Sequence, residues 1–407
     1  PADGLRQLTV CAYHGASARR GGKRVPKRWP QVLLTLLLAA WLCGCALPQA
    51  LRGRLAADAP AVPPTSGGAV ADLFAFIGSA WPDAHLPGAY GPAIHYLDCA
   101  QMRADLGQPP VGARLSEQQH RALRIALGKA DQTLDFAMVG VNPRTDGFAA
   151  RWGWDIADIE AALYVPDIEL AILTGPFDRA RIATLMAAQG EPLGEAHGFE
   201  RYSLPRLRLW VALDDRHLLI GRADAGVAEL DQFLAAHSKG GAAAREDMRA
   251  LLAELAGAWG GVLAPSGDAP ASYGGFAAGP IQQRELAEMV AQYGEFRDLY
   301  AAWHMAAIAF RGQGEGTEAR FAVTALYQYD TPELARDDVD TVRTWIELSP
   351  TLSYPGRTLG DLLTVQSVSA DGRLVRVSAE TESGFLIGRS FAERDAGGFF
   401  PLHDPSP

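Results

Sequence analysis

The sequence predicts an α+β protein: two subdomains of antiparallel sheet covered by helices, preceded by a signal peptide and a flexible linker. The first reason is the order of segments, because helix, strand and helix are followed by antiparallel strands and another helix. The second is the tight connection between apolar strands at Asp214-Asp215-Arg216 and at Asp371-Gly372. The third is composition, since 48% hydrophobic and 21% charged residues are typical of a globular chain.

The N-terminal part has the organisation of an export signal. A basic segment precedes an uncharged apolar run that starts at Gln31 and ends before Pro48. Residues 32–47 are fewer than the roughly 20 apolar residues that a membrane-spanning helix needs, so export is favoured over a transmembrane anchor. A start at Val25, from an alternative initiation codon, is one hypothesis for the beginning of this signal. The basic residues are Arg19, Arg20, Lys23, Arg24, Lys27 and Arg28.

Two cysteines close the apolar run. The residues Leu42-Cys43-Gly44-Cys45 resemble a bacterial lipobox, in which an apolar residue and two small residues precede the lipidated cysteine. We therefore expect lipidation of Cys45 and loss of Cys43 with the signal peptide. Cys43 fits the lipidated position worse, because Trp41 and Leu42 would then occupy the positions of small residues. The alternative is an ordinary secretory signal, cleaved near Cys45, with two incidental cysteines.

Charge limits the partners, and together with the lipobox it predicts how the chain is attached. Residues 1–45 hold seven of the 37 basic and one of the 47 acidic residues, which leaves 30 basic against 46 acidic side chains in the remainder. Phosphate backbones and anionic lipid headgroups repel such an acidic chain. We expect no nucleic-acid partner, and attachment to a membrane through the lipid anchor. The predicted location is the cell envelope, on the outer face of the cytoplasmic membrane or on an outer membrane.

Composition and length divide the chain into five parts. Residues 1–45 are the basic leader and lipoprotein-type signal peptide, and residues 46–68, rich in Ala, Pro and Gly, are a flexible linker. The remainder is longer than one core usually serves, which predicts two α+β subdomains at residues 69–240 and 241–395. Residues 396–407 are a tail.

The first subdomain is expected to carry its helices on one face of the sheet. Capping residues mark the helix starts, namely Ser116 with Gln119, Asp155, Asp178 and Asp224. Strands are predicted at 93–99, 133–141, 168–175, 198–204, 207–215 and 216–223, and helices at 115–127, 153–163, 177–190 and 225–237.

The second subdomain repeats this order of helices and hairpins, which makes an internal repeat a hypothesis. Thr331 is the expected cap of its last helix, with Pro332 at the first helical position. Helices are predicted at 246–256, 282–292 and 331–348, a strand at 260–265, and hairpins at 304–329 and 362–380.

Several of these segments together resemble bacterial extracytoplasmic proteins of the DUF3352 family. The resemblance implies the fold and the location predicted above. The family carries no agreed activity, so the resemblance implies no catalytic residues. The segments that carry it are 153–163, 173–190, 198–202, 211–231, 331–348 and 362–380.

No catalytic, cofactor-binding or metal-ligating residue is predicted, and no cofactor is expected. The chain contains no HExxH, Gly-x-Ser-x-Gly or Ser-x-x-Lys motif, and its histidines are not paired at metal-ligand spacing. His95 and His304 lie in apolar strand-like runs and are expected as satisfied core residues. Cys99 has apolar neighbours and is expected to be a buried structural thiol. The histidines considered are His85, His95, His120, His197, His217, His237, His304 and His403.

Two further clusters have structural explanations. The glycines Gly312, Gly314 and Gly316 predict a hairpin loop rather than a phosphate loop, because no helix follows them. Three carboxylates on one helix predict a solvated face; these are Asp337, Asp338 and Asp340.

Three functions stay open. A lipid-anchored extracytoplasmic protein with a non-enzymatic binding or envelope-associated structural role is favoured, and its protein or apolar-ligand partner is unknown. A carrier of a lipid or another apolar ligand, with a groove between sheet and helices, is one alternative, and a hydrolase with a spatially assembled site is the other. Aromatic residues of one unit are expected to fill the core rather than line a groove; they are Trp152, Trp154, Phe177, Phe199, Tyr202 and Trp210.

Overall fold

The computed structural model describes residues 68–79, 94–113, 115–121, 147–165, 169–222, 227–265, 300–313, 320–349, 357–381 and 402–403. The predicted signal peptide and Cys45 lie outside the described residues, as do the predicted strand 133–141 and the predicted helix 282–292. Residues 60–407 form one compact unit. No helix of the described part combines the length and the apolar character that crossing a membrane requires.

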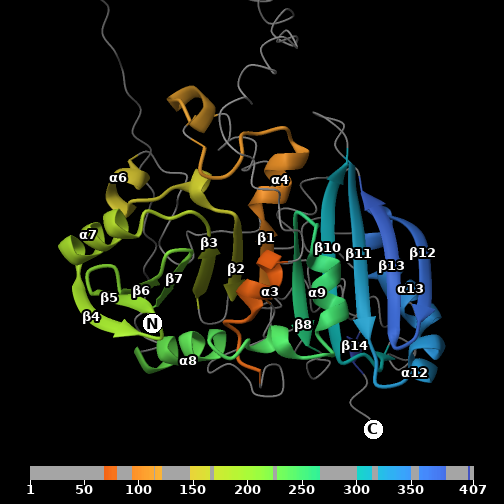
Figure 1. Ribbon diagram of the computed structural model, residues 1–407. Helices are drawn as coiled ribbons and strands as arrows, with labels where there is room; N and C mark the ends of the chain where they lie inside the picture. The colour runs from red at the N-terminus through yellow and green to blue at the C-terminus, as the bar shows by residue number, and fades with distance from the viewer. Residues whose placement is uncertain are drawn as a thin grey trace, which may run out of the picture. The chain divides into compact units, whose positions relative to one another are not determined.

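An antiparallel sheet of twelve strands organises the described part of the chain, in the order β12-β13-β11-β10-β8-β1-β2-β3-β7-β6-β5-β4 (Figure 1). Together with the surrounding helices it confirms the predicted α+β class. Two further short strands, β9 (Tyr300–Ala301) and β14 (Leu402–His403), form a parallel pair of their own. The strands of the sheet are β1 (Ile94–Asp98), β2 (Ala161–Val165), β3 (Leu170–Thr174), β4 (Glu191–Ala196), β5 (Phe199–Leu204), β6 (Leu209–Leu213), β7 (His217–Arg222), β8 (Gly260–Pro265), β10 (Met305–Gln313), β11 (Arg320–Gln328), β12 (Thr364–Asp371) and β13 (Leu374–Thr381).

The sheet runs across the boundary expected between residues 69–240 and 241–395. Strand β8 pairs with β1 on one side, with Tyr96 opposite Gly261, and with β10 on the other. The two expected subdomains therefore share one sheet instead of each having its own. The physical reason is that β8 satisfies the backbone groups of β1 and β10, which would otherwise form two unpaired edges.

Helices cover both faces of the sheet, not the one face that was expected. One core packs under α3, α8 and α9, and the other under α4, α6, α7, α12 and α13. Strands β1, β2, β3 and β6 are buried along their whole length, which requires cover on both sides. The helices are α3 (Gly68–Phe74), α4 (Cys99–Asp105), α6 (Phe148–Trp152), α7 (Arg179–Gln189), α8 (Val227–His237), α9 (Arg249–Leu255), α12 (Pro332–Asp337) and α13 (Val339–Leu348), with the 3-10 turns η2 (Ile156–Asp158), η5 (Ala242–Ala244) and η8 (Leu359–Asp361).

Capping signals predicted the helix starts well. The side chain of Asp178 accepts a hydrogen bond from the backbone of Arg181, and α7 begins immediately after it. Thr331 caps α12 in the same way, with Pro332 at the first position. These signals are local hydrogen bonds, so they can be seen without the tertiary structure.

Two elements differ from the prediction. Asp155 caps only the short turn η2, because the backbone becomes extended at Ile159, and residues 161–165 form β2 instead of the end of a helix. Strand β4 was not predicted. It is an exposed edge strand with Pro192 and a bulge before Gly194, so it lacks the apolar alternation of a half-buried strand.

The alternation of side chains along β7 determines the face of the sheet on which His217 lies. Successive residues of a strand point to opposite faces of its sheet. Leu218 and Ile220 belong to the core under α7, whereas Leu219 belongs to the core under α3 and α8. His217 begins the strand and shares the face of Leu219, so its imidazole lies under α3 and α8.

Candidate functional site

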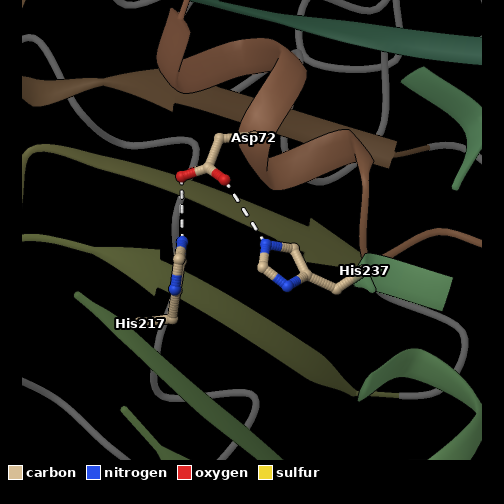
Figure 2. A group of neighbouring side chains, drawn as sticks. All are labelled: Asp72, His217 and His237. Carbon is tan, nitrogen blue, oxygen red and sulfur yellow. Dashed lines mark hydrogen bonds and ion pairs between the residues drawn. The ribbon is translucent and has the colours of Figure 1, made fainter. Parts of the chain in front are cut away.

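Four side chains from separate parts of the chain form a polar cluster, called here the aspartate–histidine cluster: Asp72, Asp214, His217 and His237. Asp72 lies on α3, whose apolar residues Val70, Leu73 and Phe74 are buried against the sheet. His217 is the first residue of β7, and His237 is the last residue of α8. Figure 2 shows both imidazoles directed at the Asp72 carboxylate.

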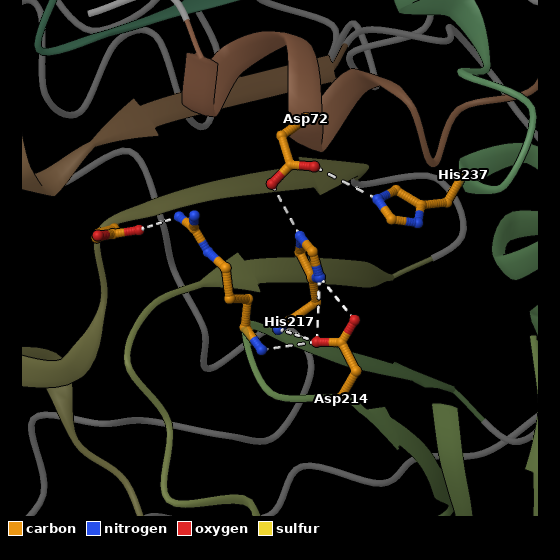
Figure 3. Close-up of polar contacts among 6 residues, drawn as sticks. Asp72, Asp214, His217 and His237 are labelled. Carbon is orange, nitrogen blue, oxygen red and sulfur yellow. Dashed lines mark hydrogen bonds and ion pairs between the residues drawn. The ribbon is translucent and has the colours of Figure 1, made fainter. Parts of the chain in front are cut away.

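The turn between β6 and β7 fixes the imidazole of His217. One oxygen of Asp214, Oδ1, accepts hydrogen bonds from the backbone N–H groups of Arg216 and His217, at 2.7 and 2.6 Å. The two carboxylate oxygens also lie 3.1 and 2.9 Å from the Nδ1 atom of His217 (Figure 3). The carboxylate therefore shapes the turn and orients the ring at the same time.

The other nitrogen of His217 faces Asp72. The Nε2 atom lies 2.8 Å from the Oδ2 atom of Asp72, and the second oxygen of Asp72 lies 3.4 Å from the Nε2 atom of His237. Both nitrogens of His217 thus contact carboxylates, which only accept hydrogen bonds when they are ionised. With both carboxylates ionised, both ring nitrogens of His217 must donate, which makes the ring an imidazolium.

The ionisation of the cluster follows from these contacts. Burial lowers the pKa of His217, but the hydrogen bonds to Asp214 and Asp72 outweigh burial and raise the pKa to about 9. For Asp72, burial acts to raise the pKa, and the hydrogen bonds from His217 and His237 reverse this and hold the pKa well below its usual range. The pKa of Asp214 is lowered in the same way, with the contacts to His217 overcoming burial.

Aromatic rings form the walls of the cluster. The ring of Phe76 stacks on His237 with centroids 4.0 Å apart and meets His217 edge-on at 5.2 Å. Phe199 lies 6.1 Å from His217 and 6.0 Å from His237. His217 has only 7% of its side chain exposed, whereas Asp72 has 33% and His237 has 24%. The cluster is therefore closed on the side of the sheet and open to solvent beside the helices.

The donor atoms of the cluster suit a metal ion. One ligand atom from each of Asp72, His217 and His237 can be chosen so that all lie within 4.8 Å of one another. The same side chains also form a hydrogen-bonded chain that ties α3 and α8 to β7. The arrangement can thus act as a structural tie, and it presents the ligands of a metal centre.

The sequence did not predict that His217 and His237 lie close to each other. They are separated by most of β7 and by α8, and Asp72 precedes His217 by 145 residues. The one local signal is the acidic turn at Asp214, which directly precedes a histidine at the start of an apolar strand. Only the packing of α3 and α8 on the same face of the sheet makes the cluster.

The other sequence candidates that the structure describes occupy structural positions. Cys45 lies outside the described residues, and Cys99 is buried at the start of α4, as predicted. His95 lies in β1 and is buried, but neither of its ring nitrogens has a hydrogen-bond partner among the described residues, contrary to the expectation of a satisfied histidine. Asp338 is half-buried between α12 and α13 and accepts a hydrogen bond from the backbone of Ala302, so it is not part of a solvated face.

The aromatic residues fill the core, as predicted. None of the six has more than 7% of its surface exposed. Trp152, Trp154, Phe177 and Tyr202 belong to the core on one face of the sheet, whereas Phe199 and Trp210 belong to the core on the other. They therefore do not share one groove.

Comparison with known proteins identifies no family. No family profile matches the sequence, and no curated protein matches it. Among solved structures, crystal form III of TP0453 is similar with a TM-score of 0.36 and 7% identity, covering 78% of this chain and 97% of the other. Crystal form IV of TP0453 gives a TM-score of 0.35 and 7% identity, covering 76% and 100%. Both TM-scores are low, so neither likeness identifies a shared fold or function.

Proposed function

We propose that the chain is an extracytoplasmic lipoprotein whose α+β domain has a binding or structural role at the cell envelope. The observation that carries the proposal is Leu42-Cys43-Gly44-Cys45, which closes an uncharged apolar run behind a basic segment. Cys45 is the lipidated residue. The likeness of several segments to the DUF3352 family supports the same location.

The composition of residues 46–68 predicts a linker between the proposed anchor and the domain. The first described helix, α3, begins at Gly68, where the Ala-, Pro- and Gly-rich residues 46–68 end. A flexible chain of this length has a root-mean-square end-to-end distance of roughly 26 Å. That distance is enough to hold a folded domain clear of the lipid headgroups.

Attachment through a lipid agrees with the charge of the chain. The formal net charge is −10 over the whole sequence, and the basic leader offsets part of the acidity of the remainder. Anionic headgroups repel such a domain. Each buried methylene contributes about 0.8 kcal/mol, and a single acyl chain gives only marginal binding, so two or three chains are needed for a stable anchor.

The position of the aromatic residues favours a binding or structural role over the carrier. A carrier needs an apolar cavity that is open to its ligand. Trp154 and Trp210, with 1% and 3% of their surface exposed, belong to cores on opposite faces of the sheet. The large aromatic side chains thus stabilise the fold instead of offering a common apolar surface.

A hydrolase is the second candidate, because the aspartate–histidine cluster gathers two imidazoles and two carboxylates, but the contacts of His217 weigh against it. A general base needs a ring nitrogen that can accept a proton. Both nitrogens of His217 already contact carboxylates, which leaves that ring no acceptor in this arrangement. The cluster in this form favours binding over proton transfer.

Labelling with a palmitate analogue in a bacterial host tests the proposal. The full chain and the variant Cys43→Ser should incorporate the label and follow the detergent in phase partitioning. Cys45→Ser should incorporate none and accumulate as a precursor of higher mass, because lipoprotein-type cleavage depends on the lipid. A truncated chain that starts after residue 50 should stay in the aqueous phase. Labelling that persists in Cys45→Ser, or an unlabelled parent chain, would overturn the proposal.

A further inference from the structure

We propose that Asp72, His217 and His237 bind one divalent transition-metal ion of the zinc class, and that Asp214 orients His217 for this role. The ligand atoms are a carboxylate oxygen of Asp72 and one ring nitrogen of each histidine, and the Nε2 atoms are the nitrogens that face Asp72. They come from α3, β7 and α8, and they lie within 4.8 Å of one another (Figure 2).

The donor set determines the class of metal. Imidazole nitrogen and carboxylate oxygen are the ligands of zinc and of other late first-row metals, whereas calcium and magnesium prefer oxygen atoms alone. Three protein ligands leave the fourth position of a tetrahedral ion for water or for an external ligand. Asp72 and His237 are partly exposed, so solvent reaches the ligand set.

The distances from the two histidines to Asp72, each to a different carboxylate oxygen, are close to those around a bound ion. Around a tetrahedral zinc ion with bonds of about 2.0–2.1 Å, neighbouring ligand atoms are about 3.3–3.4 Å apart. The Nε2 atom of His237 and the Oδ1 atom of Asp72 already have a separation of 3.4 Å. The Nε2 atom of His217 lies 2.8 Å from Asp72, so this pair must open by about 0.5 Å to admit the ion. The metal then takes the place of the proton on that nitrogen, which is released to solvent.

Asp214 accepts the second hydrogen bond that a histidine ligand of a metal ion usually donates. Histidine ligands usually donate their other ring N–H to a carboxylate, which fixes the tautomer and directs the lone pair at the metal. The Nδ1 atom of His217 lies 2.9 Å from Asp214, and backbone hydrogen bonds hold that carboxylate in the β6–β7 turn (Figure 3).

The two rings are also held in place by packing. Phe76 stacks on His237 at 4.0 Å and meets His217 edge-on, and Phe199 lies against both rings. Ligands that are fixed before the ion arrives lose little conformational entropy when they bind it. The hydrogen-bonded chain from Asp214 through His217 and Asp72 to His237 holds these elements together without a metal, so the metal-free protein is expected to fold.

Zinc titration of the full chain, purified in detergent and stripped with a chelator that is then removed, tests this inference. Calorimetry and elemental analysis should give one bound zinc per chain. His237→Gln should weaken zinc binding at least 10-fold by removing a ligand, and Asp214→Asn should weaken it 10- to 100-fold by removing the orienting carboxylate. The control is His197→Asn, which removes an exposed histidine outside the cluster and should change the affinity less than 2-fold.

A second measurement keeps the inference testable if a variant fails to fold. Cobalt(II) added to the metal-free parent chain should give the intense visible absorption of a four-coordinate ion, and zinc should displace it. The absence of stoichiometric zinc binding, or equal zinc affinity in His237→Gln and His197→Asn, would overturn the inference. Neither outcome bears on the lipid anchor, which depends on Cys45.

Discussion

The Nε2 atom of His217 lies 2.8 Å from the Oδ2 atom of Asp72, although 145 residues separate the two in the sequence. The contact connects α3, the first described helix, to the first residue of β7. Asp214 holds the other side of the same ring, and the second oxygen of Asp72 faces His237. A continuous chain of charged and polar contacts thus runs from the β6–β7 turn to the end of α8.

Asp72→Asn should destabilise the metal-free protein. The substitution leaves the buried imidazolium of His217 with one carboxylate partner instead of two. Hydrogen bonds to charged groups contribute about 1.5–3 kcal/mol each, and partial exposure of Asp72 places the expected loss near the lower end. Urea unfolding in the presence of a chelator measures this loss.

The matched control for Asp72→Asn is Glu333→Gln. Glu333 and Arg336 form an ion pair on the surface of α12, with 69% and 63% of their side chains exposed. Such pairs contribute less than about 1 kcal/mol. Equal losses in the two variants would contradict a stabilising role for the cluster.

Burial of His95 should lower the free energy of unfolding at acidic pH. Burial lowers the pKa of His95 to about 4, whereas the ordinary value is 6.5. Between these values the unfolded chain binds a proton that the folded chain does not, so stability falls as the pH decreases from 6.5 towards 4. The full difference corresponds to about 3 kcal/mol.

His95→Leu isolates this effect, because other groups titrate in the same range. The free energy of unfolding of the variant should depend less steeply on pH between 4 and 6.5 than that of the parent chain. Above pH 7 the two curves should run parallel. Parallel curves over the whole range would show that His95 is accessible to protons in the folded protein.

Gly312→Ala should destabilise the sheet. A Cβ atom at this position of β10 would lie 2.1 Å from the indole ring of Trp259, whose Nε1 donates a hydrogen bond to Asp105. Overpacking of this kind costs about 1–3 kcal/mol. Gly78→Ala is the control, since a Cβ atom there meets nothing within 4 Å and its backbone angle is ordinary. In thermal unfolding, the melting temperature of Gly312→Ala should be clearly lower than that of Gly78→Ala. Similar melting temperatures would contradict the packing of Trp259 on Gly312.

Arg103→Met should unfold more readily than Arg103→Lys. The buried guanidinium donates hydrogen bonds of 2.8 Å to the carbonyl oxygens of Pro109, Pro110 and Ala157. Methionine fills the space but removes all three hydrogen bonds. The carbonyl oxygens of Pro110 and Ala157 each keep a backbone N–H donor, so the expected loss is about 3 kcal/mol. Lysine keeps a charged donor and should restore part of the stability in urea unfolding. Equal loss in both variants would show that packing, not hydrogen bonding, is the contribution of Arg103.

Much of the local structure could be predicted from the sequence. Asp178, Thr331 and the Asp371-Gly372 turn act through hydrogen bonds and backbone preferences of a few neighbouring residues, and each lies where it was expected. The order of the strands could not be predicted in this way. Pairing of β8 with β1 depends on contacts between distant segments, and the edge strand β4 carries no apolar pattern.

The candidate site could not be predicted from the sequence. His217 and His237 were rejected as ligands because their spacing fits no local metal motif, and Asp72 was not considered. Their proximity comes from two helices that pack on the same face of β7, on which His217 lies by strand alternation. Patterns along the chain describe neighbours in sequence, whereas this cluster is made by tertiary packing.

The most direct measurement of the central claim is the mass of the N-terminal peptide of the mature protein. Membranes from cells that express the full chain are extracted, and the purified protein is digested and analysed by mass spectrometry. The account predicts a peptide that begins at Cys45 and carries a diacylglyceryl group on its sulfur, with Cys43 absent. An unmodified N-terminus beyond Cys45, or a retained segment 32–47, would contradict it.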